Sequence, residues 1–203
     1  MTGVPTLTLQ QNDAPFRDDP AQSFTLPARF YLDDDIYRHE MEKIFKRSWW
    51  YAGHASQIPK VGDYLTTSID EQSIFIVRDR EQNLRAFYNV CQHRGHELVD
   101  GSGHANVIVC PYHAWSYDLD GSLIGARNTA KMAGFNKCDF SLKAVQVEIF
   151  CGMVFVNLDP QALPLSEQTG NLETEIRKYC PDVDNLSFAQ RDTYEVALSL
   201  IHI

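Results

Sequence analysis

No stretch of this sequence of 203 residues is apolar for the roughly 18 residues that a membrane-spanning helix requires, and no apolar run follows a basic N-terminus. The sequence therefore predicts neither a membrane span nor a signal peptide. Positive charge is also scarce, because 18 Lys and Arg residues stand against 27 Asp and Glu residues, for a net charge of −9. This acidic balance argues against nucleic acid or an anionic membrane as a partner.

Cysteines number only five, and two of them belong to a motif described below. The other three, Cys138, Cys151 and Cys180, are odd in number and show no spacing typical of a disulfide framework. We therefore expect reduced thiols and a cytoplasmic location. Hydrophobic residues, by contrast, make up 44% of the chain and aromatic residues 11%, which suffices for a packed core.

Two Cys/His pairs stand out in the middle of the chain. Cys91 and His93 are separated by one residue, and Cys110 and His113 by two. Thiolate and imidazole ligands suit zinc or iron, so the residue types alone leave the metal open. In an extended segment, residues i and i+2 lie roughly 6.6 Å apart, which is wide for two ligands of one zinc ion. The spacing instead favours two metals side by side, each taking ligands from both pairs.

The two pairs resemble the Rieske motif, and their flanks at residues 89–95 and 110–115 resemble the large subunits of Rieske non-haem iron oxygenases. The resemblance implies one Rieske [2Fe–2S] cluster, with Cys91 and Cys110 on one iron and His93 and His113 on the other. It also implies that the potential of the cluster falls with rising pH, as a His ligand loses its far ring proton.

Four neighbouring residues are expected to support the cluster. Gly95 lets the backbone turn close to it, and Arg94 orients the first loop or an interface. Tyr112 and Trp115 shield the cluster, although ordinary packing explains them equally well. His96 and Tyr112 resemble the positions where respiratory-chain Rieske proteins carry a disulfide, which favours the oxygenase or ferredoxin branch.

The fold class is expected to be mainly β, because many short alternating segments are separated by turn signals. A helix is predicted over 33–48, and its packing stripe is expected to comprise Tyr37, Met41, Ile44 and Ser48, widened by Ile36 and Phe45. Trp49, Trp50 and Tyr51 are expected to close a core. Predicted strands cover 64–69, 73–78, 84–90, 106–109, 143–150, 153–158 and 187–196, with a bend at 151–152, a loop at 125–141 and a weak helix at 170–180. The resemblance implies a Rieske-type antiparallel β-sandwich with a small cluster-binding lobe at about 88–120.

Three segments are expected: an N-terminal arm and helix at 1–48, a Rieske domain at 49–160, and the truncated start of an α+β catalytic domain at 161–203. Oxygenases of this family use a mononuclear iron held by two His and one carboxylate. His202 is the only His after His113, so we expect that site in a missing C-terminal part. Residues 198–203 are suspected to be foreign to the natural protein.

The resemblance implies the electron-transfer domain of a terminal oxygenase that hydroxylates a small organic substrate with O₂ and electrons from NAD(P)H. A reductase or ferredoxin would donate the electrons, and the full-length protein would be a homo-oligomer of the trimer type. Flanks at 49–53 and 113–121 resemble the choline, carnitine and betaine branch more than the naphthalene type. Two alternatives stay open: a stand-alone Rieske ferredoxin-type carrier and a zinc-binding module.

Overall fold

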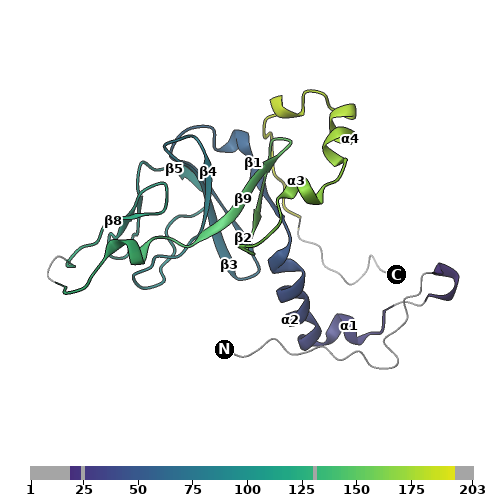
Figure 1. Cartoon of the computed structure of the whole chain (residues 1–203), viewed down its shortest axis with the longest axis horizontal. Helices are drawn as coiled ribbons and strands as arrows, with labels where there is room; N and C mark the ends of the chain where they lie inside the picture. The colour runs from purple at the N-terminus through teal and green to yellow at the C-terminus, as the bar shows by residue number, and fades with distance from the viewer. Residues whose placement is uncertain (1–18, 24–25, 130–131, 195–203) are drawn as a thin grey trace.

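The computed structural model describes residues 19–23, 26–129 and 132–194, and two antiparallel sheets dominate it (Figure 1). The larger sheet has the strand order β1-β10-β9-β4-β3-β2-β5, and the smaller one has the order β6-β7-β8. The mainly β prediction is confirmed. The strands of the large sheet are β1 Trp50–His54, β2 Asp63–Ile69, β3 Gln72–Arg78, β4 Leu84–Tyr88, β5 Ser102–His104, β9 Ala144–Phe150 and β10 Met153–Asn157; the small sheet comprises β6 Ile108–Val109, β7 Ser116–Tyr117 and β8 Leu123–Gly125.

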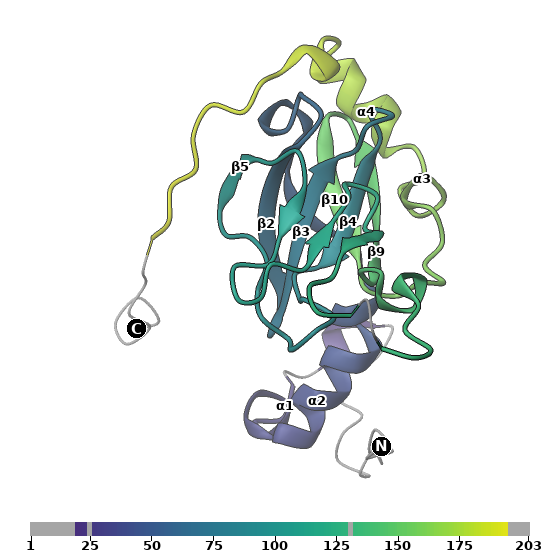
Figure 2. The same cartoon turned by 90° about the vertical axis from the view of Figure 1, so that its left-hand side faces the viewer.

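Short helices flank the sheets. The helix pair α1–α2 projects from one end of the large sheet, and α3 and α4 lie at the other end (Figures 1 and 2). Among the described residues, no helix is both long enough and apolar enough to cross a membrane. The α-helices are α1 Arg29–Leu32, α2 Asp34–Lys43, α3 Leu165–Gln168 and α4 Leu172–Tyr179; the 3₁₀ turns are η1 Pro20–Gln22, η2 Phe45–Arg47, η3 Ala55–Gln57, η4 Lys137–Phe140 and η5 Val183–Asn185.

Strand β3 is buried on both faces, which explains its unbroken apolar run. Successive side chains of a strand point to opposite faces. Ile74 and Ile76 therefore lie in the core on one face of the large sheet, with strand β10 opposite them. Phe75 and Val77 lie in a second core, which the small sheet and its loops cover on the other face. The small sheet, of which β8 is labelled in Figure 1, thus forms a lobe whose side chains pack against those of β3 and β4.

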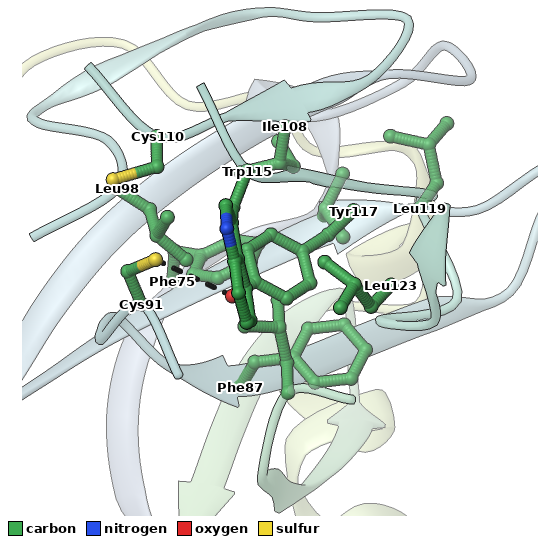
Figure 3. Close-up of a cluster of buried hydrophobic side chains, with 12 residues drawn as sticks. Phe75, Phe87, Cys91, Leu98, Ile108, Cys110, Trp115, Tyr117, Leu119 and Leu123 are labelled. Atoms are coloured by element: carbon green, nitrogen blue, oxygen red, sulfur yellow. Dashed lines mark hydrogen bonds between the residues drawn. The ribbon is translucent and has the colours of Figure 1, made fainter. Parts of the chain in front are cut away.

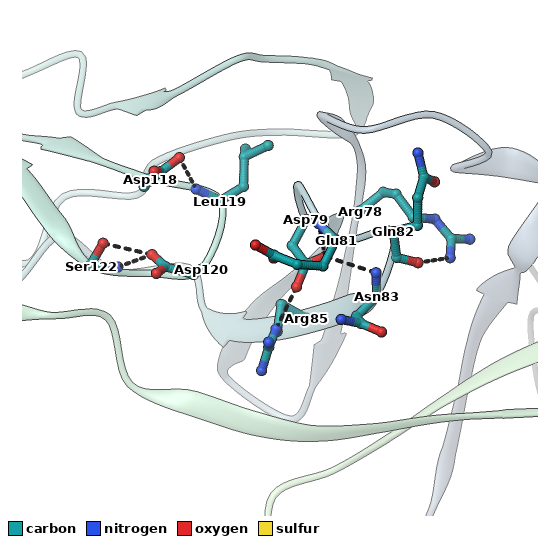
Figure 4. A network of polar contacts seen from close by, with 10 residues as sticks. All are labelled: Arg78, Asp79, Glu81, Gln82, Asn83, Arg85, Asp118, Leu119, Asp120 and Ser122. Carbon is teal, nitrogen blue, oxygen red and sulfur yellow. Dashed lines mark hydrogen bonds and ion pairs between the residues drawn. The ribbon is translucent and has the colours of Figure 1, made fainter.

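A buried carboxylate shapes the turn between β3 and β4 (Figure 4). Asp79 is 0% exposed, and its Oδ1 accepts from the backbone N–H groups of Glu81 at 3.0 Å and Asn83 at 2.7 Å. Its Oδ2 accepts from Arg85 Nε at 2.8 Å. Burial alone raises the pKa of Asp79, but the Arg85 and backbone hydrogen bonds outweigh it and lower the pKa overall.

The same turn anchors the lobe to the large sheet. Arg80 Nε donates to Asp118 Oδ1 at 3.0 Å, and its Nη2 donates to the carbonyl of Asn106 at 3.1 Å. Gly121, at a φ of 86°, lies against the ring of Phe87 so closely that an added Cβ would be 2.4 Å from Cε1. These contacts fix the position of the lobe on strand β4.

The predicted helix over 33–48 is shorter than expected, because α2 ends at Lys43 and a 3₁₀ turn follows. The packing stripe was partly wrong. Met41 is buried as predicted, but Tyr37 and Ile44 are each 54% exposed. Ile36, which was predicted to widen the stripe, is buried as well. The helix touches the protein along a narrower face than the full stripe requires.

The aromatic residues at the start of β1 do not all close a core. Trp49 packs against a third apolar cluster, but Tyr51 is 54% exposed, so that prediction was wrong for Tyr51. Trp50 stacks on Phe45, with ring centroids 5.6 Å apart, and donates through Nε1 to the Phe45 carbonyl at 2.7 Å. Trp50 and Tyr51 of β1 therefore lie at the surface and do not close a core.

The remaining predictions differ by segment. The bend at 151–152 is confirmed, since Cys151 and Gly152 have φ values of 51° and 76° between β9 and β10. The predicted helix at 170–180 is α4, but residues 187–194 form no strand, and 195–196 lie outside the described residues. The predicted loop at 125–141 contains the turn η4. Most of the predicted arm at 1–28 also lies outside the described residues.

Candidate metal centre

The two ligand loops, 91–96 and 110–115, have the same backbone hydrogen bonds. In each loop the N–H of the Cys donates to the carbonyl five residues later, at 2.8 Å in both. The carbonyl of the same Cys accepts from the N–H four residues later, at 2.9 Å in the first loop and 3.0 Å in the second. That fourth residue is left-handed in both loops: Gly95 has a φ of 70° and Ala114 a φ of 57°. Gly95 thus makes the predicted turn.

The two thiols of the loops lie together in the core of the lobe (Figure 3). Cys91 and Cys110 are each 2% exposed, and both belong to the same buried cluster. Burial raises the pKa of the Cys91 thiol, while hydrogen bonds from Tyr117 and from the backbone N–H of His93 act in the opposite direction. Groups that donate to sulfur favour the thiolate form that binds metal.

Tyr117, which belongs to strand β7, places its hydroxyl group beside the Cys91 sulfur. Its OH lies 3.3 Å from Cys91 Sγ and accepts the backbone N–H of Gln92 at 3.0 Å. Because Gln92 already donates to the oxygen, the hydroxyl proton is free to point at sulfur. Burial and the neighbouring Cys91 raise the pKa of Tyr117, so it stays a protonated donor.

The two imidazoles lie together at the outer end of the loops. The ring centroids of His93 and His113 are 4.8 Å apart at an angle of 75°. Burial, followed by His113 and Arg94, lowers the pKa of His93 and favours the neutral ring, which is the form that binds metal. His113 Nδ1 is buried without a hydrogen-bond partner among the described residues. An unpartnered buried nitrogen beside a second imidazole fits a bound metal.

Aromatic rings surround the imidazoles. Trp115 is 4% exposed and stacks on His93, with centroids 4.7 Å apart and planes 13° apart. Tyr112 contacts His113 with a centroid distance of 3.8 Å and reaches His96 at 5.6 Å, but is itself 56% exposed. Trp115 therefore covers one imidazole as a shield would, whereas Tyr112 lies at the surface.

A half-open cavity of about 740 Å³ borders both imidazoles. The arginine among its lining residues is its sole charged side chain, and no carboxylate of the described residues faces it. The lining is Gln92, His93, Pro111, Tyr112, His113, Ala114, Trp115, Arg127, Asn128, Thr129, Met132, Phe135 and Phe140. Arg94 is exposed and does not line this cavity.

The four predicted ligands are thus brought together as a buried pair of thiols and an outer pair of imidazoles. Within the part of the chain that the structure describes, no three Cys, His, Asp or Glu side chains are arranged to hold one metal ion. Two pairs fit a two-iron cluster better than a zinc knuckle, which requires four ligands around one ion.

The sequence motifs did not reveal Tyr117. The signal for Tyr117 was available in the alternation of the segment after the second loop, where Trp115 and Tyr117 both point into the core. Its contact with Cys91 joins residues 26 positions apart, and no local pattern encodes that contact.

Comparison with known proteins adds three findings. A family described as the Rieske [2Fe-2S] domain matches residues 48–143. The carnitine monooxygenase oxygenase subunit of Escherichia coli K12 is 43% identical over 190 residues, which cover 93% of this chain and 50% of that protein. The glycine betaine monooxygenase oxygenase subunit of Pseudomonas aeruginosa is 35% identical over 176 residues, covering 86% of this chain and 40% of that protein.

Among solved structures, the quaternary ammonium Rieske monooxygenase CntA in complex with L-carnitine superposes with a TM-score of 0.79 at 41% identity. The match covers 83% of this chain and 48% of that one. The chain therefore spans about half the length of the curated relatives that it matches, in their N-terminal part.

Proposed function

Residues 48–143 form a Rieske [2Fe–2S] domain related to those of terminal oxygenases, and from this premise we propose that the chain is the electron-transfer part of an oxygenase acting on a quaternary ammonium compound. The relatives named for carnitine and glycine betaine support this substrate class. The full-length protein would hydroxylate its substrate with O₂ and electrons from NAD(P)H. A reductase or ferredoxin would deliver those electrons.

We assign Cys91 and Cys110 to the inner iron and His93 and His113 to the outer iron. The observation that carries the assignment is the sorting of the four side chains: both thiols are buried at 2% exposure, and both imidazoles border the open cavity. When bound, the cluster supplies a one-electron carrier whose potential is raised by its two neutral His ligands. The outer ligands would face the partner that exchanges electrons with it.

The protein's own groups hold this arrangement. The hydroxyl of Tyr117 lies 3.3 Å from Cys91 Sγ and would donate to its thiolate, and the backbone N–H of His93 likewise acts to lower the pKa of Cys91. Trp115 stacks on His93 and fixes the plane of its ring. Arg94 adds positive charge at the surface beside the first loop and, with burial and His113, favours the neutral form of His93.

The domain division that we propose is an arm and helix at 1–48, the Rieske domain at 49–160, and the start of a catalytic domain at 161–203. The large sheet supports the second boundary, since β10 ends at Asn157. His202 is the sole histidine after His113, so we place the two-His, one-carboxylate iron site outside these 203 residues. Electrons would cross between subunits of a trimer to reach it.

The test is chemical analysis of the purified chain. Iron and acid-labile sulfide should be present in equal amounts, and dithionite should produce an electron paramagnetic resonance (EPR) signal. Cys91→Ser should abolish both, whereas Cys138→Ser, at an exposed cysteine, should change neither. Zinc without sulfide would overturn the assignment in favour of a zinc module.

A test of the substrate class requires a protein in which this segment is joined to a catalytic domain. With a reductase and NAD(P)H, carnitine or glycine betaine should stimulate O₂ consumption and yield a hydroxylated product. Naphthalene serves as the matched aromatic control and should do neither. Turnover of naphthalene alone would place the protein among ring dihydroxylating enzymes instead.

A further inference from the structure

Asn89 is a fully buried amide beside the first ligand loop, and its polar atoms are all engaged. It is 1% exposed. Its Oδ1 accepts the backbone N–H groups of Leu98 and Val99, each at 3.1 Å, and its Nδ2 donates to the carbonyl of Val99 at 2.7 Å. Nδ2 also lies 3.0 Å from Glu97 Oε1 and 3.2 Å from Ser73 Oγ, so its two hydrogens are shared among three acceptors. These partners fix which end of the amide is oxygen.

The second ligand loop is closed in a different way. Strands β6 and β7 flank it and pair through their backbones, Ile108 with Tyr117 and Val109 with Ser116. Ile108 lies two residues before the Cys of its loop, and Tyr117 lies seven residues after it. A backbone ladder thus holds the two ends of the second loop together.

The first loop has no such ladder within the described residues. Strand β4 ends at Tyr88, and β5, which begins at Ser102, pairs with β2 instead. Asn89 nevertheless lies two residues before Cys91, and Leu98 lies seven residues after it. Asn89 and Leu98 thus occupy the same positions in the first loop as Ile108 and Tyr117 in the second. The side chain of Asn89 makes the hydrogen bond to Leu98 that backbone pairing provides between Ile108 and Tyr117.

We infer that Asn89 is a positioning residue whose side-chain amide replaces the missing strand pair and sets Cys91 and His93 relative to the second loop. This inference rests on the proposed [2Fe–2S] site. Leu98 connects Asn89 to the metal ligands. Its N–H bonds to Asn89, and its side chain, 6% exposed, packs beside Cys91 and Cys110 in the lobe core (Figure 3). Loss of the side-chain amide would release residues 97–99, which follow the first loop, from the large sheet.

Ser73 links to the large sheet the hydrogen bonds that Asn89 makes with residues 97–99, which we call the clamp. Its hydroxyl donates to Glu97 Oε1 at 2.6 Å, and its carbonyl accepts the backbone N–H of Asn89 at 2.9 Å. Ser73 belongs to β3, whose side chains pack in both cores. Asn89 therefore ties the first ligand loop to β3, whose residues 74–77 are all buried.

The test compares two buried asparagines in the cluster-loaded chain. Asn89→Leu removes every side-chain hydrogen bond that Asn89 makes, whereas Asn89→Asp keeps an acceptor for the two N–H groups and loses the donor. The control is Asn157→Leu. Asn157 is 0% exposed, donates to the carbonyl of Arg47 at 3.0 Å and accepts from Asp159 N at 2.9 Å, far from the ligand loops in sequence.

Asn89→Leu should release its cluster roughly tenfold faster or more, as expected when buried backbone groups lose their partners. Its reduction potential and EPR g values should also shift, and Asn89→Asp should fall between this variant and wild type. Asn157→Leu should lose thermal stability while its cluster keeps the wild-type potential and g values. Equal potentials and g values in all three variants would reduce Asn89 to an ordinary core residue and overturn the inference.

A measurement on the wild-type protein covers the case in which Asn89→Leu fails to fold. Hydrogen exchange with mass spectrometry should find the amides of Leu98 and Val99 protected, although they lie in no strand. Exchange as fast as that of an exposed loop would contradict the clamp. A wild-type chain that binds no iron and sulfide would instead contradict the proposed function, so the two failures are distinguishable.

Discussion

The hydroxyl of Tyr117 offers a single-atom test of how this lobe tunes its metal centre. Tyr117→Phe removes the oxygen 3.3 Å from Cys91 Sγ and leaves the ring, which is 0% exposed, in place. Reduction adds negative charge to the cluster, and a donor to sulfur stabilises the reduced state more than the oxidised one. Removal of the donor should therefore lower the reduction potential.

The size of the shift follows from the strength of the bond. A hydrogen bond to a charged group contributes about 1.5–3 kcal/mol, and only the part gained on reduction, which we take as about 1 kcal/mol, affects the potential. For a one-electron couple about 59 mV corresponds to about 1.4 kcal/mol, so the potential should fall by about 40 mV. The N–H of Gln92 also loses its acceptor, but that loss is the same in both oxidation states.

The assay is a potentiometric titration monitored by EPR. Tyr64→Phe is the matched control, since Tyr64 packs against the same core cluster and has no hydrogen bond to Cys91 among the described contacts. Its potential should equal that of wild type. A Tyr117→Phe potential that is unchanged or raised, with an intact EPR spectrum, would refute the reasoning.

Four further substitutions test the backbone and the buried turn, each by chemical denaturation. Gly95→Ala should destabilise the cluster-loaded protein by about 1 kcal/mol and Ala114→Gly should stabilise it, because both positions are left-handed; shifts of the same sign would contradict this. Gly121→Ala should destabilise by about 2–4 kcal/mol, since its Cβ would also meet Phe87 at 2.4 Å, and a loss no larger than that of Gly95→Ala would count against the position of the lobe. Asp79→Ala should lose about 1.5–3 kcal/mol at neutral pH. Burial raises the pKa of Asp79, but its hydrogen-bond donors lower it overall, so its contribution is complete above about pH 4 and disappears as pH falls through the lower folded-state pKa. A difference between wild type and Asp79→Ala that already narrows at pH 6 would be inconsistent with that direction.

The candidate site was accessible from sequence because its chemistry is local. Cys91 and His93, like Cys110 and His113, are close in the chain, and their residue types and spacing carry the ligand set. Strands such as β4 were predicted because alternation and turn residues are local as well. The assignment of the four ligands itself stays a prediction that metal analysis has to test.

Features that depend on distant contacts were not accessible. The exposure of Tyr37 and Ile44 depends on how α2 meets the protein, which helical periodicity alone does not specify. Tyr117 and Asn89 gain their roles from partners in other elements, and neither lies within a ligand pair. Over its described residues, 187–194, the strand expected at 187–196 is absent, because the residue pattern of a segment does not specify whether it pairs with a sheet edge.

Pulsed EPR on the dithionite-reduced chain, with ¹⁵N-labelled histidine, tests the central claim most directly. The account predicts couplings from two histidine nitrogens at one iron, lost in His93→Cys or His113→Cys and retained in His96→Ala. A spectrum with no nitrogen coupling, or one in which His96→Ala removes a coupling, would contradict it.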